Sequence, residues 1–149
     1  ISGHGGIVSQ IAGDGLMAIF GAPLPLDAHA EAAVRAALEM IDLIRLFNAE
    51  QAAAGKPQIR IGVGIASGAM VAGYTGTNER ATYTCIGDTV NLASRLEAHT
   101  KIAGRAILID SATHADVGDI DADPLGAVEI RGKSQPVDVF AVAAPEQQD

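Results

Sequence analysis

The sequence lacks tryptophan altogether and contains only two tyrosines and three phenylalanines among its 149 residues. A hydrophobic core must therefore be built from alanine, valine, isoleucine and leucine. A single cysteine, Cys85, excludes a disulfide framework and is typical of proteins from a reducing compartment. We therefore expect a cytoplasmic location, either for a cytoplasmic protein or for the cytoplasmic domain of a membrane-anchored one.

Long apolar runs and a positive net charge are missing as well. No apolar stretch reaches the length of a transmembrane helix, and no signal peptide is visible. Acidic residues number 18 and basic residues 10, which gives a net charge of −8 at pH 7. Such a chain repels nucleic acids and anionic membrane surfaces, so we expect neither as a partner. A phosphate ester as ligand would need a local basic patch or a metal ion.

The residues that are present indicate a folded domain. Hydrophobic residues make up 48% of the chain, which excludes an intrinsically disordered protein. The length is that of one domain, and we expect residues 1–149 to form it. The chain begins at Ile1 without an initiating methionine, which we interpret as the sign of a longer parent protein whose N-terminal part is missing here.

The first half of the chain shows hairpin, helix and strand patterns in turn. Two apolar runs, 7–12 and 16–20, flank Gly-Asp-Gly, which predicts a β-hairpin. Residues 28–48 have a helical period, and the Ala-Gly-Lys-Pro at 54–57 ends that helix. Alternating isoleucine and valine predict a strand over 59–65, with Gly62 and Gly64 on a face that another element approaches closely.

The second half continues the alternation of helices and strands. We expect a short helix from 67 to 74, a strand at 82–86, and a helix capped by Asp88 that runs to about residue 97. A strand at 106–110 precedes a short helix capped by Ser111, and a last hairpin joins 128–130 to 137–142. This order predicts an α+β or α/β sheet covered by helices.

A few polar residues stand out as candidates for chemistry. Asp14 at the first hairpin turn is either a plain turn residue or a carboxylate open to bind Mg²⁺. Asn91 and Arg95 are four residues apart on one helix face, which is either solvated or directed at a ribose and a phosphate. Lys133, beside Arg131 in a turn, is either an exposed lysine or a contact for a triphosphate.

Other catalytic patterns are missing. The four histidines have no metal-ligand spacing, and neither a P-loop nor a nucleophile elbow occurs. Cys85 lies between Thr84 and Ile86 in an apolar strand, which favours a core thiol over a nucleophile.

Three stretches together resemble the catalytic domain of class III adenylate and guanylate cyclases of bacterial type. They are 11–23 (IAGDGLMAIFGAP), 80–97 (RATYTCIGDTVNLASRLE) and 131–137 (RGKSQPV). The middle stretch is the most specific, and the resemblance covers nearly the whole chain. It implies an α+β, ferredoxin-like palm with a mixed, mainly antiparallel sheet covered by helices. It also places the family's first metal-binding aspartate, and the strand that carries it, upstream of Ile1.

The resemblance assigns a role to each matching residue. Asp14 matches the second metal-binding aspartate, Asn91 the asparagine that orients the ribose, and Arg95 the arginine that stabilises the transition state. Lys133 matches a lysine that contacts the triphosphate, and Arg80 falls near a basic residue of the same loop.

The purine-selecting pair departs from the usual family pattern. In the family, a lysine that reads adenine is common at the position of Gln10. The partner of that lysine, at the position of Thr84, is usually an aspartate. Glutamine both donates and accepts hydrogen bonds, so Gln10 and Thr84 could read either adenine or guanine. Thr84 favours ATP, because the same substitution recurs in a bacterial branch of adenylate cyclases.

The activity that the resemblance implies is conversion of ATP to 3′,5′-cyclic AMP and pyrophosphate. Two Mg²⁺ or Mn²⁺ ions would assist each site, and the sites would lie between the subunits of a homodimer. Two alternatives stay open: a guanylate cyclase that uses GTP, and an inactive pseudo-cyclase that only binds nucleotide or dimerises. Family members are commonly fused to a regulatory domain, so we expect one in the parent protein.

Overall fold

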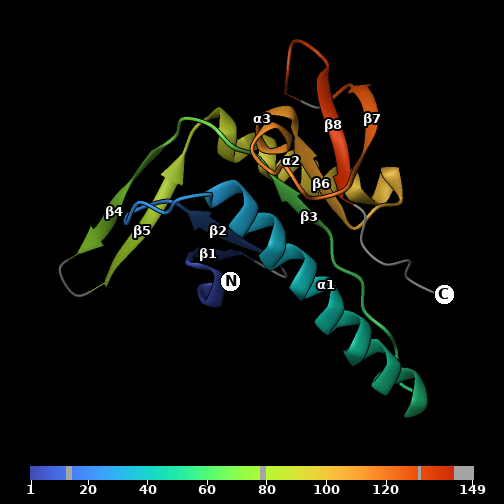
Figure 1. Ribbon diagram of the computed structural model, residues 1–149. Helices are drawn as coiled ribbons and strands as arrows, with labels where there is room; N and C mark the ends of the chain where they lie inside the picture. The colour runs from blue at the N-terminus through green and yellow to red at the C-terminus, as the bar shows by residue number, and fades with distance from the viewer. Residues whose placement is uncertain (13–14, 78–79, 131, 143–149) are drawn as a thin grey trace.

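The computed structural model describes residues 1–12, 15–77, 80–130 and 132–142. Three helices, a short 3-10 helix and eight strands follow one another in these ranges (Figure 1). In chain order they are η1 (Ser2–His4), β1 (Gly6–Ala12), β2 (Gly15–Phe20), α1 (His29–Ala53), β3 (Val63–Ile65), β4 (Val71–Thr77), β5 (Arg80–Ile86), α2 (Asp88–Ala103), β6 (Ile107–Asp110), α3 (Ser111–Ala115), β7 (Ala122–Val128) and β8 (Val137–Val142).

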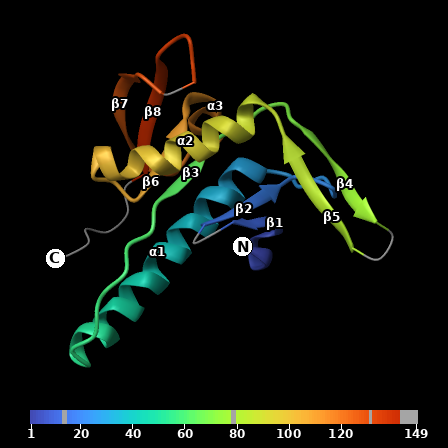
Figure 2. The ribbon, with the colours of Figure 1, turned by 180° about the vertical axis from the view of Figure 1, so that it is seen from behind.

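The strands form one central sheet and two hairpins. The central sheet has the order β3-β6-β8-β7, with β3 parallel to β6 and the other pairs antiparallel. Strands β1 and β2 form one hairpin, and β4 and β5 form another that projects from the body of the molecule (Figures 1 and 2). The sheet is therefore mixed and mainly antiparallel, which confirms the expected α+β class.

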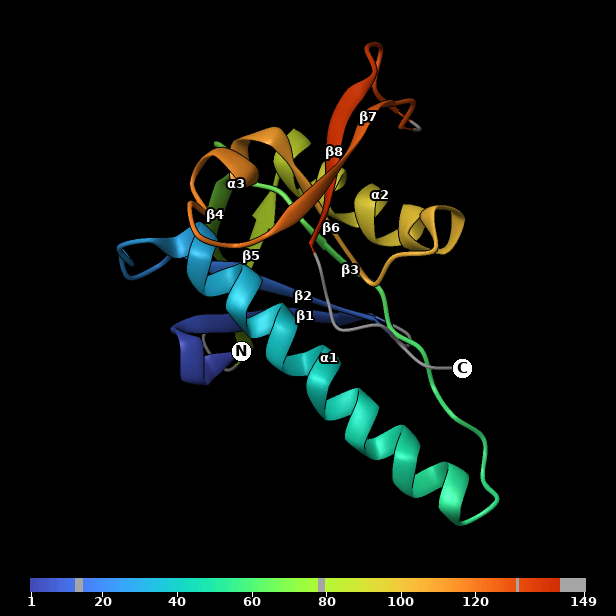
Figure 3. The same cartoon turned by 45° about the vertical axis from the view of Figure 1, so that its right-hand side comes forward.

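Helix α1 covers one face of the central sheet with its first half. Its buried residues repeat at helical spacing and contact Ile107 and Ile109 of β6; in the core they are Ala30, Val34, Ala37 and Ile41. The helix is longer than the pattern predicted and ends at Ala53, immediately before the Ala-Gly-Lys-Pro stop. Its last turns extend beyond the sheets (Figure 3), and none of its residues after Ile41 is buried.

Helix α2 covers the other face of the same sheet. Leu92 and Leu96 pack against Leu108 of β6 and Val139 of β8. Because side chains alternate along a strand, Leu108 points towards α2 while its neighbours in β6 point towards α1. Strand β6 is thus buried on both faces, and it fixes α2 relative to the rest of the fold.

Two glycines allow α2 to lie close to β3. A Cβ atom on Gly64 would clash with the carbonyl oxygen of Ala93 and the amide nitrogen of Glu97, and one on Gly62 would clash with Thr100. The close approach predicted from these glycines is confirmed, and the approaching element is α2.

Several local predictions were wrong. Residues 71–74, expected in a helix, belong to β4, because pairing with β5 outweighs their local preference. The strand expected over 59–65 is limited to Val63–Ile65, since the backbone of Ile59 exchanges two hydrogen bonds of 2.8 Å with the Asn48 side chain instead. The last hairpin begins earlier than expected, at Ala122.

The expected helix caps are also displaced by one residue. Gly87 is the N-cap of α2 and supplies no side-chain capping bond, and Asp88 is the first helical residue. Asp110 caps α3 by accepting a 3.0 Å hydrogen bond from the Thr113 amide, so Ser111 is not the cap.

Candidate nucleotide site

The face of α2 that points away from the core carries three polar side chains. Asp88, Asn91 and Arg95 follow one another at i, i+3 and i+7, so they share one side of the helix. All three are exposed, and Leu92 between them is buried against the central sheet. Because Leu92 is anchored against the sheet, the rotation of α2 about its axis is fixed. Asp88, Asn91 and Arg95 therefore face away from the core.

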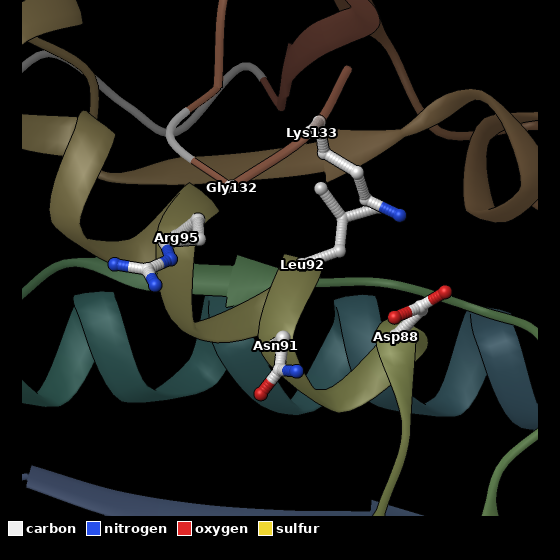
Figure 4. Close-up of a pocket in the computed structure, with 6 residues that line it drawn as sticks. All are labelled: Asp88, Asn91, Leu92, Arg95, Gly132 and Lys133. Atoms are coloured by element: carbon white, nitrogen blue, oxygen red, sulfur yellow. The ribbon is translucent and has the colours of Figure 1, made fainter. Parts of the chain in front are cut away.

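A turn between β7 and β8 completes a pocket over this face (Figure 4). The pocket has a volume of about 80 Å³ and is lined by Asp88, Asn91, Leu92, Arg95, Gly132 and Lys133. Ile130, which is buried next to α2, anchors the turn, and its carbonyl accepts a 3.1 Å hydrogen bond from the Lys133 amide. Of the predicted site residues, Asn91, Arg95 and Lys133 are thus brought together from segments far apart in the sequence.

Gly132 of the turn lies next to the guanidinium of Arg95. Its φ of 88° is a conformation that side chains disfavour. A Cβ atom there would stand 3.8 Å from one guanidinium nitrogen of Arg95 and 3.9 Å from another. The turn therefore lies within ordinary van der Waals contact of the guanidinium, and the positive φ is what disfavours a side chain at position 132.

The pocket is a locally basic place in an acidic protein. Arg95 and Lys133 contribute two positive charges, and Asp88 contributes one negative charge. An arginine fork binds two oxygens of a phosphate at once, and a lysine adds a compact charge. The volume equals that of roughly two or three water molecules, so this pocket holds only part of a nucleotide. A second, wider hollow of about 360 Å³ adjoins it and shares Gly132 and Lys133.

Asp88 was missed as a pocket residue by sequence reasoning, which assigned it to a helix cap. Asp88 precedes Asn91 by three residues and Arg95 by seven, and both spacings return to the same helix face. This spacing is the sequence signal that predicts Asp88 as a neighbour of the other two.

The other predicted site residues lie on the two hairpins or outside the described residues. Gln10 is paired with Met17 in the backbone of the first hairpin, and Thr84 with Gly73 in that of the second. Strand β1 contacts β5, so the two hairpins lie next to each other. Arg80 begins β5.

Asp14 lies outside the described residues. The strands on either side of it pair as far as Ala12 and Gly15, which confirms the hairpin. In the part of the chain that the structure describes, no group of three or more histidine, cysteine or acidic residues is arranged to hold a metal ion.

Cys85 has an environment that suits a packing residue. Burial raises the pKa of its thiol above the ordinary value of 9.0, and a hydrogen bond from Ser9 opposes part of that rise. A raised pKa keeps the thiol protonated and unreactive near neutral pH.

The described helices include none with the length and apolarity needed to cross a bilayer.

Comparison with known proteins places this architecture in a family. The family model "Adenylate and Guanylate cyclase catalytic domain" matches residues 7–143. Adenylate cyclase 1 of Rhizobium meliloti is 38% identical over 143 residues, which are 95% of this chain and 22% of that protein. The chain thus spans less than a quarter of the length of that curated relative.

Solved structures agree with the sequence comparison. The adenylyl cyclase CyaB from P. aeruginosa superposes with a TM-score of 0.85 at 32% identity, over 98% of this chain and 76% of that one. The guanylyl cyclase Cya2 superposes with a TM-score of 0.85 at 32% identity, over 96% of this chain and 72% of that one. The chain belongs to the class III adenylate and guanylate cyclase family and is a nucleotide cyclase catalytic domain.

Proposed function

We propose that this domain converts ATP to 3′,5′-cyclic AMP and pyrophosphate. The proposal is carried by one observation: Asn91, Arg95 and Lys133, from two distant segments, line the same pocket. In the reaction the ribose 3′-oxygen bonds to the α-phosphorus, the bond from that phosphorus to the β-phosphate oxygen breaks, and the hydroxyl proton is released. Pyrophosphate leaves with the electrons of the broken bond.

Each pocket residue then has one task. The Asn91 amide hydrogen-bonds the ribose and holds its 3′-hydroxyl in line with the phosphorus. The Arg95 guanidinium faces the α-phosphoryl oxygens, where negative charge grows in the transition state. The Lys133 ammonium binds the β- and γ-phosphates and favours departure of pyrophosphate. Asp88, which lines the same pocket, would repel a misplaced phosphate.

We assign metal binding to Asp14. A lone carboxylate at a hairpin tip fits the chemistry of Mg²⁺ or Mn²⁺, which take one or two carboxylates together with phosphate oxygens. Two such ions, when bound, would lower the pKa of the 3′-hydroxyl and neutralise charge on the leaving group. The second protein carboxylate would come from a segment outside residues 1–149, as the resemblance implies.

We assign choice of the purine to Gln10 and Thr84. The backbone contact between β1 and β5 supports a shared role for these two residues. The equal similarity to an adenylyl and a guanylyl cyclase leaves GTP as the alternative substrate. An adenylate cyclase among the curated relatives, together with Thr84, makes ATP the proposed one.

We further propose that the active form is a homodimer with sites between the subunits. The pocket of about 80 Å³ and the adjoining hollow of about 360 Å³ lie at the protein surface, where a second subunit would supply further walls around a bound nucleotide. On the projecting hairpin, Val71 is 69% exposed and its cross-strand partner Ile86 is 67% exposed. An exposed apolar pair of this kind is suited to burial against a second subunit.

A mixing experiment tests the shared site. Asp14→Ala and Asn91→Ala are each expected to abolish cyclic AMP formation without unfolding the protein. If each site takes Asp14 from one subunit and Asn91 from the other, a heterodimer of the two variants has one intact site. An equal mixture would then recover about a quarter of wild-type activity, since half of the dimers are mixed and each has one working site of two. Absence of any recovery, in samples shown to exchange subunits, would refute the shared site.

A further inference from the structure

The projecting hairpin β4–β5 joins the body of the molecule at its base, where β5 leads directly into α2 (Figure 2). The hairpin is a sheet of its own, and its ladder ends at the pair Val71 and Ile86. Within the described residues it therefore shares no ladder with the central sheet. Its direction depends on its contact with β1 and on whatever holds its base.

A side-chain hydrogen bond closes this base. The hydroxyl of Thr89, in the first turn of α2, donates at 2.9 Å to the backbone carbonyl of Ala69, two residues before β4 begins. The two residues are 20 positions apart, and the whole hairpin lies between them. The segments lie close together here, because a Cβ atom on Gly68 would stand 2.8 Å from the Thr89 hydroxyl oxygen. The bond thus ties the chain that enters the hairpin to the helix that leaves it.

The loop that carries this carbonyl, 66–70, is itself anchored to the core. The hydroxyl of Ser67 forms a 2.8 Å hydrogen bond with that of Thr113 on α3. Thr113 is fully buried, so the loop starts from a fixed point. At the other end of the contact, the N-cap Gly87 supplies no side-chain bond to the start of α2. Thr89 is therefore a side chain through which the first turn of α2 is held to the core.

We propose that Thr89 is a positioning residue that locks the base of the β4–β5 hairpin to the first turn of α2 and so sets the place of Asn91. Asn91 follows Thr89 by two residues, and its backbone amide donates a 3.1 Å hydrogen bond to the carbonyl of Gly87 in the same turn. Without the lock this turn would shift, and attack in line with the phosphorus tolerates little misplacement of the ribose. The inference rests on the proposed function for the role of Asn91, whereas the lock itself does not depend on it.

Steady-state kinetics with ATP and Mg²⁺, together with hydrogen–deuterium exchange, test the proposal in the full-length protein. Thr89→Val keeps the shape of the side chain and removes its hydroxyl. We expect kcat to fall about fivefold, the effect of one hydrogen bond, with little change in KM. Amides in the first turn of α2 should exchange about fivefold faster for the same reason. Thr89→Ser keeps the hydroxyl and is expected to keep wild-type kcat and exchange.

Thr100→Val is the matched control. Thr100 lies on the same helix, and its hydroxyl donates at 2.6 Å to the carbonyl of Glu97, so this bond stays within α2. Because Thr100 is buried, we expect the substitution to lower the melting temperature. It should leave kcat and exchange in the first turn unchanged. Thr89→Ala also lacks the hydroxyl and carries the same expectation as Thr89→Val, should the latter fail to fold.

Each contrary result has a distinct meaning. Wild-type kcat in Thr89→Val, or a loss just as large in Thr89→Ser or in Thr100→Val, would overturn the positioning role and leave the proposed function standing. A loss that disappears when the protein concentration is raised would overturn it too, since weaker dimerisation would then be the cause. If the unmodified protein forms no cyclic nucleotide, the proposed function fails and the role for Asn91 fails with it. Unchanged exchange in Thr89→Val would overturn the lock in either case.

Discussion

Gly64 lies where helix α2 crosses strand β3, and Gly64→Ala probes how the site is held in place. The added Cβ atom would lie 2.9 Å from the carbonyl carbon of Leu96, and closer still to backbone atoms of Ala93 and Glu97. All three obstacles are backbone atoms of a helix, so no side-chain rotation relieves the clash. Ordinary contact begins at 3.4 Å, so relief of the Leu96 contact alone requires α2 to move by 0.5 Å, and the closer contacts require a larger movement.

The size of the effect follows from this geometry. Overpacking of a core costs about 1–3 kcal/mol, and an obstacle made of backbone belongs at the upper end of that range. The loss of about 0.4–1 kcal/mol of chain entropy in the unfolded state offsets part of it. We expect the free energy of unfolding to fall by about 2 kcal/mol, which lowers the melting temperature by roughly 4–8 °C. Because α2 carries Asn91 and Arg95, we expect kcat/KM to fall about 10- to 100-fold as well.

The assay compares Gly64→Ala with Gly118→Ala by thermal unfolding and by cyclic nucleotide formation. A Cβ atom on Gly118 meets nothing within 4 Å, and the residue lies between α3 and β7, away from the pocket. The control should keep both its melting temperature and its activity. A Gly64→Ala protein as stable and as active as wild type would refute the close packing of α2 on β3.

Other variants test the packing, the capping and the electrostatics. Leu96→Ala removes a fully buried side chain between α2 and the central sheet and should cost about 2–5 kcal/mol in urea unfolding; a loss below 1 kcal/mol would contradict its burial. Asp110→Ala removes the cap of α3 and should cost about 1 kcal/mol, whereas Asp110→Asn should cost less because its side chain still accepts from the Thr113 amide. Alkylation of the single thiol, Cys85, should keep accelerating above pH 9, because a raised pKa keeps the thiolate fraction low until higher pH. In Ser9→Ala the same profile should move further upward, since the lost hydrogen bond had lowered that pKa; an unshifted profile would contradict the contact.

Local patterns predicted the parts of the site that depend on a single element. The spacing of Asn91 and Arg95 placed both on one helix face, and Gly62 and Gly64 marked a close approach. These features follow from helix and strand periodicity alone. Periodicity does not encode how distant segments pack. It therefore predicts neither that α2 is the element lying on the two glycines nor that a turn brings Lys133 over α2.

The wrong local predictions also result from contacts between separate segments of the chain. Strand β4 has weak local signals and forms because β5 pairs with it along its whole length. The register shift of β1 between Val8 and Gln10, which was not predicted from the sequence, depends on pairing with β2 and is specified by neither strand alone. The roles of all the predicted site residues stay predictions, as does the cytoplasmic location; these residues are Gln10, Asp14, Arg80, Thr84, Asn91, Arg95 and Lys133.

The most direct test of the proposed function is cyclic nucleotide formation by the full-length protein, with ATP and with GTP, in Mg²⁺ and in Mn²⁺. Arg95→Ala is compared with Arg105→Ala, which removes a surface arginine paired with Asp123. We predict metal-dependent cyclic AMP formation that falls about 100-fold or more in Arg95→Ala and is unchanged in Arg105→Ala. A folded, dimeric protein that forms no cyclic nucleotide from either substrate would contradict the account and identify a domain that binds or dimerises without catalysis.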